Sequence, residues 1–94
     1  MMLLREVYME DLVEHLVKHH SDEDARIGLM EECAELTEVI ARTFRPERNV
    51  ETERIAEEMA HVCISMSVVA AQFGVTPVMI RDEVNKKRQK HGLI

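Results

Sequence analysis

Hydrophobic residues recur along this chain at the three- and four-residue spacing that is typical of amphipathic helices. The pattern predicts four helices with short connections, over about residues 3–19, 21–43, 50–73 and 76–90. Ser21 begins a run of cap candidates and first-turn acids, Gly74 is the expected end of the third helix, and Thr76 precedes a proline that suits a first turn. We therefore expect an all-α fold, a four-helix bundle formed by a single domain of residues 1–94.

The two central helices differ in how their polar residues are placed. In segment 21–43 the apolar residues form one half of the helix, and the other half carries Glu31, Glu32, Glu35 and Glu38. Taken alone, this is an ordinary amphipathic helix with a solvated acidic face. From Ile55 to Phe73 the next helix is apolar on nearly all sides, which favours cover by neighbours and hence a homo-oligomer. Its one narrow polar stripe consists of Arg54, Glu58, His61, Ser65 and Gln72.

Composition narrows the possible partners and compartment. A net charge of −6 argues against general nucleic-acid binding, although the C-terminal segment is basic. Cys33 and Cys63 are isolated in apolar contexts, so we expect buried free thiols in a reducing, cytoplasmic setting. No apolar run reaches the length of a membrane span, and Arg5 interrupts any signal-like start. The methionines, Met59, Met66 and Met79 among them, are expected to fill the core.

Two pairs of residues carry most of the functional information. Glu32 and Glu35 on one helix, and Glu58 and His61 on the next, are each spaced i, i+3, so the members of a pair project from one side. A charged residue inside a mostly apolar helix costs free energy unless it is paired or binds a metal. Two facing pairs would make a pocket of oxygen ligands that suits a hard cation such as Mg²⁺.

At these residues the sequence resembles the all-α nucleoside triphosphate pyrophosphohydrolases, the superfamily of MazG and the dimeric dUTPases. Their motif is EExxE on one helix and ExxD on the next. The run from Glu31 to Glu35 matches the first half fully, and Glu58 to His61 matches the second half except that His61 stands where the family usually has Asp. The resemblance covers roughly Ile27 to the end of the chain.

The resemblance implies a helical bundle that assembles as a homodimer or homotetramer and hydrolyses a nucleoside triphosphate to the monophosphate and pyrophosphate. It implies Mg²⁺ held by Glu32, Glu35, Glu58 and His61, with Glu31 or Glu35 in a catalytic role such as that of the base. Contacts to the triphosphate would come from a basic segment, Asn85, Lys86, Lys87 and Arg88.

The departure at His61 leaves several possibilities open. Imidazole is a better ligand for Mn²⁺ or another transition metal than for Mg²⁺, so His61 would shift the metal preference, leave the metal an extra water, or mark weakened catalysis. Glu57, close by on the same helix, is a substitute carboxylate. For His61 itself the rival interpretation is a core histidine that is hydrogen-bonded across the bundle.

Two other functions also remain open. Arg26-Ile27-Gly28 resembles the pattern of phosphoribosyl-ATP pyrophosphohydrolase, but Leu29 and Met30 before the glutamates fit MazG-like members better. The second is a non-catalytic helical oligomer that keeps the fold as a binding or assembly module.

Overall fold

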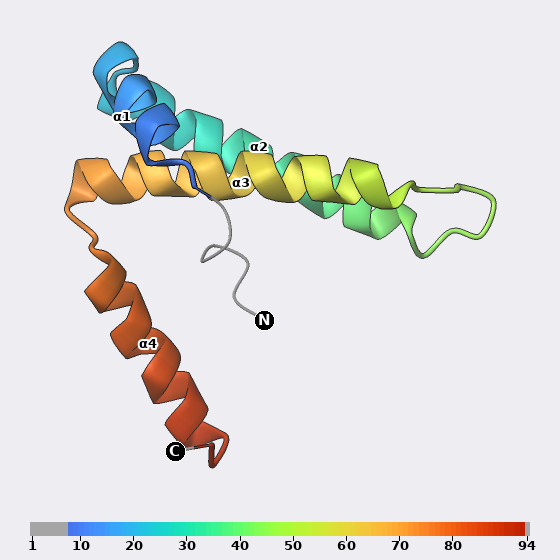
Figure 1. Cartoon of the computed structure of the whole chain (residues 1–94). Coiled ribbons are helices and arrows are strands. Elements are labelled where there is room, and N and C mark those ends of the chain that lie inside the picture. Colours follow the sequence, from blue (N-terminus) through green and yellow to red (C-terminus); the bar gives the residue numbers. More distant parts are fainter. Residues whose placement is uncertain (1–7, 94) are drawn as a thin grey trace.

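The computed structural model describes residues 8–93, and over that range the chain forms four α-helices and no strand (Figure 1). The helices are α1 (Glu10–His19), α2 (Asp22–Arg42), α3 (Thr52–Phe73) and α4 (Pro77–Lys90). The prediction of an all-α fold is confirmed.

Local sequence determines most of the helix ends. The hydroxyl of Ser21 accepts a hydrogen bond from the amide of Asp24 at 3.1 Å, which caps α2. Gly74 ends α3 with a positive φ of 71°, a left-handed conformation in which glycine avoids the cost of a Cβ. At the start of α4 the hydroxyl of Thr76 accepts from the amide of Met79 at 3.3 Å, and Pro77 follows the cap. These three predicted ends are confirmed.

The first helix begins later than its hydrophobic pattern suggests. Residues 3–7 of the expected helix lie outside the described residues, and Tyr8 and Met9 are not helical, so the prediction is wrong for those two. The two acids Glu10 and Asp11 occupy the first turn, where negative charge interacts favourably with the free amides. The carboxylate of Asp11 also accepts a hydrogen bond from the amide of Leu12 at 2.8 Å.

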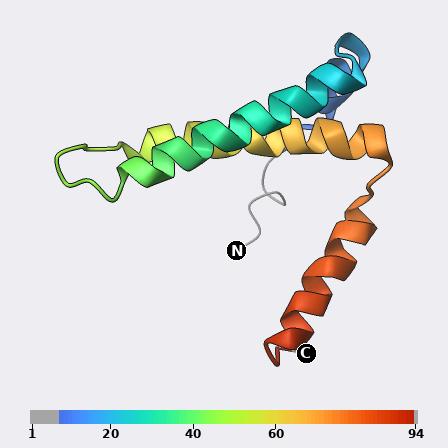
Figure 2. The ribbon, with the colours of Figure 1, turned by 180° about the vertical axis from the view of Figure 1, so that it is seen from behind.

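The helices α2 and α3 run antiparallel as a long hairpin, and α1 packs on α3 near the opposite end from the connecting loop (Figures 1 and 2). Three side chains along the hairpin are fully buried: Val39, Val68 and the carboxylate Glu58. Two valines are a small core, which makes the buried charge of Glu58 the more conspicuous feature of the interior.

The face that α2 turns toward α3 differs from the predicted one. Ile27, Met30 and Ile40 are exposed, with Met30 exposed by 72%. Cys33 is exposed as well and Cys63 is half-buried, so the expectation of two buried thiols is wrong for Cys33. The polar stripe of α3 explains the rotation, because its charged residues draw the acids of α2 into the contact between the helices.

Three methionines of the described helices, Met59, Met66 and Met79, do not fill a core within this single chain. Met59, Met66 and Met79 are all exposed by two fifths or more. The expectation that they pack inside is therefore wrong for the chain by itself, and these side chains remain available for contact with another molecule.

The helix α4 stands apart from the rest of the described chain. It leaves α3 at a bend of 112° and packs against none of the other three helices, so the predicted four-helix bundle is not closed within one chain (Figure 1). None of the described helices is by itself long and apolar enough to cross a membrane, and only the bent pair of α3 and α4, taken together, meets that criterion by length and composition.

Candidate metal centre

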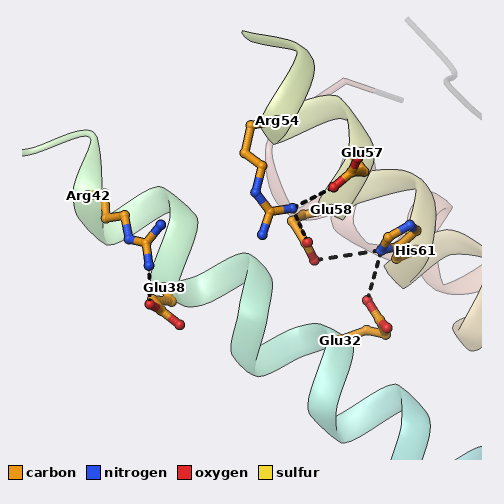
Figure 3. A network of polar contacts seen from close by, with 7 residues as sticks. All are labelled: Glu32, Glu38, Arg42, Arg54, Glu57, Glu58 and His61. Carbon is orange, nitrogen blue, oxygen red and sulfur yellow. Dashed lines mark hydrogen bonds and ion pairs between the residues drawn. The ribbon is translucent and has the colours of Figure 1, made fainter. Parts of the chain in front are cut away.

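The antiparallel register of the hairpin brings the two sequence pairs face to face. His61 Nδ1 on α3 lies 3.2 Å from Glu32 Oε2 on α2, and 3.9 Å from Glu58 Oε2 one turn earlier on its own helix (Figure 3). Because the helices are antiparallel, Glu35 lies one turn along α2 from Glu32, at the level of Glu58.

All four predicted ligands gather at one point. One ligand atom from each of Glu32, Glu35, Glu58 and His61 lies within 4.8 Å of the other three. Opposite ligands of Mg²⁺ are about 4.2 Å apart, since each bond measures about 2.1 Å. The upper limit of 4.8 Å is close to that span, so small side-chain movements would bring the four groups onto one cation. That they bind a metal stays a prediction.

The strongest physical sign of a ligand is the burial of Glu58. Its side chain is 2% exposed, and a buried carboxylate is costly unless its charge is compensated. Arg54, one turn earlier, makes an ion pair with Glu58 Oε1 and also contacts Glu57 at 2.8 Å (Figure 3). The hydrogen bond to Glu58 raises the pKa of Arg54, so the guanidinium keeps its charge.

Arg54 compensates only one edge of the buried carboxylate. Within the described residues, Glu58 Oε2 and Glu32 Oε2 are both buried and accept no hydrogen bond. Both of these oxygens face His61. Two buried carboxylate oxygens that accept no hydrogen bond and a nearby imidazole nitrogen, all directed at one point, are a donor set that suits a divalent cation.

The carboxylates also act on one another. The negative charges of Glu32 and then of Glu58 raise the pKa of Glu35 above its ordinary value of 4.5, against a smaller opposite effect of Arg54. Such repulsion among the buried Glu58, the half-buried Glu32 and the exposed Glu35 is the cost that a bound cation would remove. The electrostatics and the geometry thus favour the same occupant.

Other predicted site residues are not part of this cluster. Glu31 is exposed and does not belong to the group of four. Asn85, Lys86, Lys87 and Arg88 lie on α4, which contacts no other described helix, and Lys86 pairs with Glu83 at 3.0 Å. Within one chain these four residues do not reach the acidic cluster, and their proposed role with a triphosphate stays a prediction.

Arg54 is the residue of the site whose role was not predicted from the sequence. It was recognised as part of the polar stripe, but not as the partner of the buried Glu58. Its i, i+4 spacing to Glu58 was a visible signal. The same spacing joins Arg42 to the exposed Glu38, so spacing alone does not distinguish a pair at the site from a surface pair.

Comparison of the chain with protein-family models, with curated proteins and with solved structures gave no match.

Proposed function

We propose that this protein is a metal-dependent nucleoside triphosphate pyrophosphohydrolase, which releases pyrophosphate and a nucleoside monophosphate. The observation that carries the proposal is the convergence of Glu32, Glu35, Glu58 and His61, with the buried oxygen of Glu58 left without a partner. The resemblance to the EExxE and ExxD motif supplies the reaction class, and the cluster supplies a place for the cation that such chemistry needs.

Each residue of the cluster has a definable part in that function. Glu32, Glu35, Glu58 and His61 would hold the divalent cation, which offsets phosphate charge and lowers the pKa of an attacking water. Arg54 holds the carboxylate of Glu58 by its Oε1 and so leaves Oε2 directed toward His61 (Figure 3). Glu31 is exposed on α2 next to Glu32, and it is the general-base candidate that the resemblance suggests.

A homo-oligomer is part of the same proposal. The chain exposes 7677 Å², whereas a compact monomer of 10.9 kDa exposes about 5,600 Å². Its radius of gyration of 15.5 Å also exceeds the value of about 12 Å for a compact chain of this length. An excess near 2,000 Å² per chain is of the order that an obligate interface buries. A second copy of this chain, covering α4 and the exposed side of α3, accounts for it.

The proposed reaction is tested by measuring pyrophosphate release from a panel of nucleoside triphosphates with Mg²⁺ or Mn²⁺. We expect turnover, and higher turnover with Mn²⁺ because His61 offers nitrogen. Glu35→Gln removes one ligand charge and should lower kcat/KM by roughly 100-fold. Glu38→Gln is the matched control, because Glu38 lies on the same helix, is exposed and pairs with Arg42 outside the cluster.

Two results would change the assignment. Release from phosphoribosyl-ATP alone would identify the phosphoribosyl-ATP pyrophosphohydrolase alternative. An absence of release from every nucleotide with either metal, and equal behaviour of Glu35→Gln and Glu38→Gln, would leave the non-catalytic assembly module as the function.

A further inference from the structure

A small pocket lies along the same contact between α2 and α3 as the acidic cluster. It has a volume of about 130 Å³ and is lined by α1, α2 and α3. Gly28 of α2 and Ser65 of α3 are among its lining residues, each four residues from a member of the cluster, Glu32 and His61 respectively. Four residues of helix correspond to a rise of about 6 Å, so the pocket opens one turn away from the cluster.

The size of the pocket indicates what kind of group it holds. Pockets that enclose a whole small-molecule ligand measure about 300–1,000 Å³, so a volume of 130 Å³ takes one ring system only. Its walls include the apolar side chains of Leu16 and the buried Val68, which suit the faces of a flat ring.

The carboxylate in the polar lining suits a nitrogenous ring better than a phosphate. Asp24 stands in the acidic first turn of α2 and repels an anion, while its carboxylate accepts hydrogen bonds from N–H groups. Ser65 and His20 add a hydroxyl and an imidazole. Asp24 and His20 are exposed and Ser65 is half-buried, so a ligand in the pocket can reach all three polar groups.

We propose that this pocket receives the nucleobase of the nucleotide whose phosphates lie at the acidic cluster. The inference rests on the proposed function and adds where the nucleoside end of the substrate binds. The phosphates would bind a cation held at Glu58 and His61, the sugar would span the one helical turn between His61 and Ser65, and the base would enter between Val68 and Leu16.

Gly28 provides a direct means of closing the pocket. A Cβ placed on Gly28 meets no atom within 4 Å, so the space beside its backbone is open. The backbone at Gly28 therefore has room for a Cβ, and we expect the larger side chain of Gly28→Leu to occupy part of the pocket that Gly28 lines. Both Gly28→Leu and Gly28→Ala also raise helix propensity, so α2 is kept. Gly28→Ala adds only the Cβ and is the matched control.

The experiment compares these two variants in the full chain with a nucleoside triphosphate and with inorganic tripolyphosphate. Gly28→Leu should raise KM for the nucleoside triphosphate by roughly tenfold or more. Inhibition by tripolyphosphate and affinity for Mn²⁺ should not change, because neither uses the pocket. Gly28→Ala should resemble the wild type. An active Gly28→Leu enzyme with wild-type KM would overturn the inference and leave the proposed function intact.

A binding measurement keeps the test independent of turnover. Nucleoside monophosphate is titrated into the wild type, Gly28→Ala and Gly28→Leu in the presence of Mn²⁺. We expect binding to the first two and a loss with the third. If the wild type releases no pyrophosphate, the proposed function fails, but the same three titrations still decide whether a base enters the pocket. Equal binding by all three proteins, or by none, would refute it.

Discussion

At the scale of single residues, the ion pair between Arg54 and Glu58 joins the stability of the protein to its site. The buried carboxylate of Glu58 faces a guanidinium on one edge and the predicted cation position on the other (Figure 3). When one partner of such a pair is removed, the charge that remains buried is uncompensated. Arg54 thus compensates part of the buried charge that the proposed cation would also compensate.

Arg54→Ala should lower the melting temperature of the apoprotein clearly. The expected cause is the uncompensated charge of Glu58. Arg42→Ala is the matched control, since both arginines are 42% exposed and both pair at i, i+4, but the partner of Arg42 is the exposed Glu38. Surface pairs of that kind contribute little, so Arg42→Ala should leave the melting temperature nearly unchanged.

Divalent metal should distinguish this pair from a purely structural one. Added Mn²⁺ should raise the melting temperature of Arg54→Ala more than that of Arg42→Ala, because the cation compensates the charge of Glu58 that Arg54 no longer compensates. Equal melting temperatures for the two apo variants would contradict the role given to Arg54. If Mn²⁺ raises the melting temperatures of the two variants equally, the ion pair of Arg54 and Glu58 does not contribute to the cation site.

The pKa of Glu35 predicts how apoprotein stability depends on pH. The neighbouring carboxylates of Glu32 and Glu58 raise this pKa in the folded state above the ordinary 4.5. Near pH 7 the ionised Glu35 is therefore repelled. As the pH falls through the raised pKa the folded protein takes up the proton first, so stability is gained, and the gain is complete below about 4.5.

The measurement compares the melting temperatures of the wild type and Glu35→Gln between pH 7 and 4 without metal. At pH 7 Glu35→Gln should be the more stable protein, and the difference should shrink toward acid pH. With Mn²⁺ at pH 7 the wild type should have the higher melting temperature, since it retains the carboxylate of Glu35 as a ligand for the cation and Glu35→Gln does not. A constant difference across this range would show that the carboxylates do not interact.

At the scale of helices, local sequence signals predict where most helices begin and end. They do not predict which faces of two helices contact each other. The ends at Ser21, Gly74 and Thr76 follow from short-range hydrogen bonds and backbone preferences, so sequence predicts them well. The start of the first helix was predicted too early, because a hydrophobic period does not say where the first turn begins. Acids in that turn, Glu10 and Asp11, were the better signal.

The rotation of α2 could not be predicted from its own residues. Its apolar half was expected to face the core, yet Met30 and Ile40 are exposed and Glu32 faces α3. The reason lies on the other helix, where the buried Glu58 and the neighbouring His61 require polar partners. Hydrophobic periodicity describes the faces of one helix at a time, whereas the acidic cluster forms only when residues of α2 and α3 come together. The motif spacing therefore identified the four residues that converge, although hydrophobicity alone assigned two of them to a solvated face.

At the scale of the whole molecule, one chain leaves many large apolar side chains uncovered. On α4 alone, four large hydrophobic residues are exposed: Val78, Met79, Ile80 and Val84. Of these, Ile80 and Val84 are spaced i, i+4 and so lie on one side of the helix, as an apolar pair at an interface would. The separation of α4 from the hairpin also keeps its basic segment away from the acidic cluster of the same chain. A second copy of the chain is proposed to cover the apolar residues of α4. The same assembly would allow the basic segment of one chain to reach the acidic cluster of the other.

Ile80→Glu should reduce assembly measured by sedimentation velocity over a range of protein concentrations. Ile80 is already 54% exposed in the single chain, so a glutamate there should change the stability of a monomer little. It should weaken an interface between chains that buries this position. Gln89→Glu is the control, because nine residues of helix place it on the opposite side of α4 while changing the charge equally. We expect a dimer or tetramer for the wild type and Gln89→Glu, with dissociation and a lower melting temperature for Ile80→Glu. A wild type that sediments as a monomer at every concentration, with a melting temperature that does not depend on concentration, would contradict the proposed oligomer, because an obligate assembly couples folding to association.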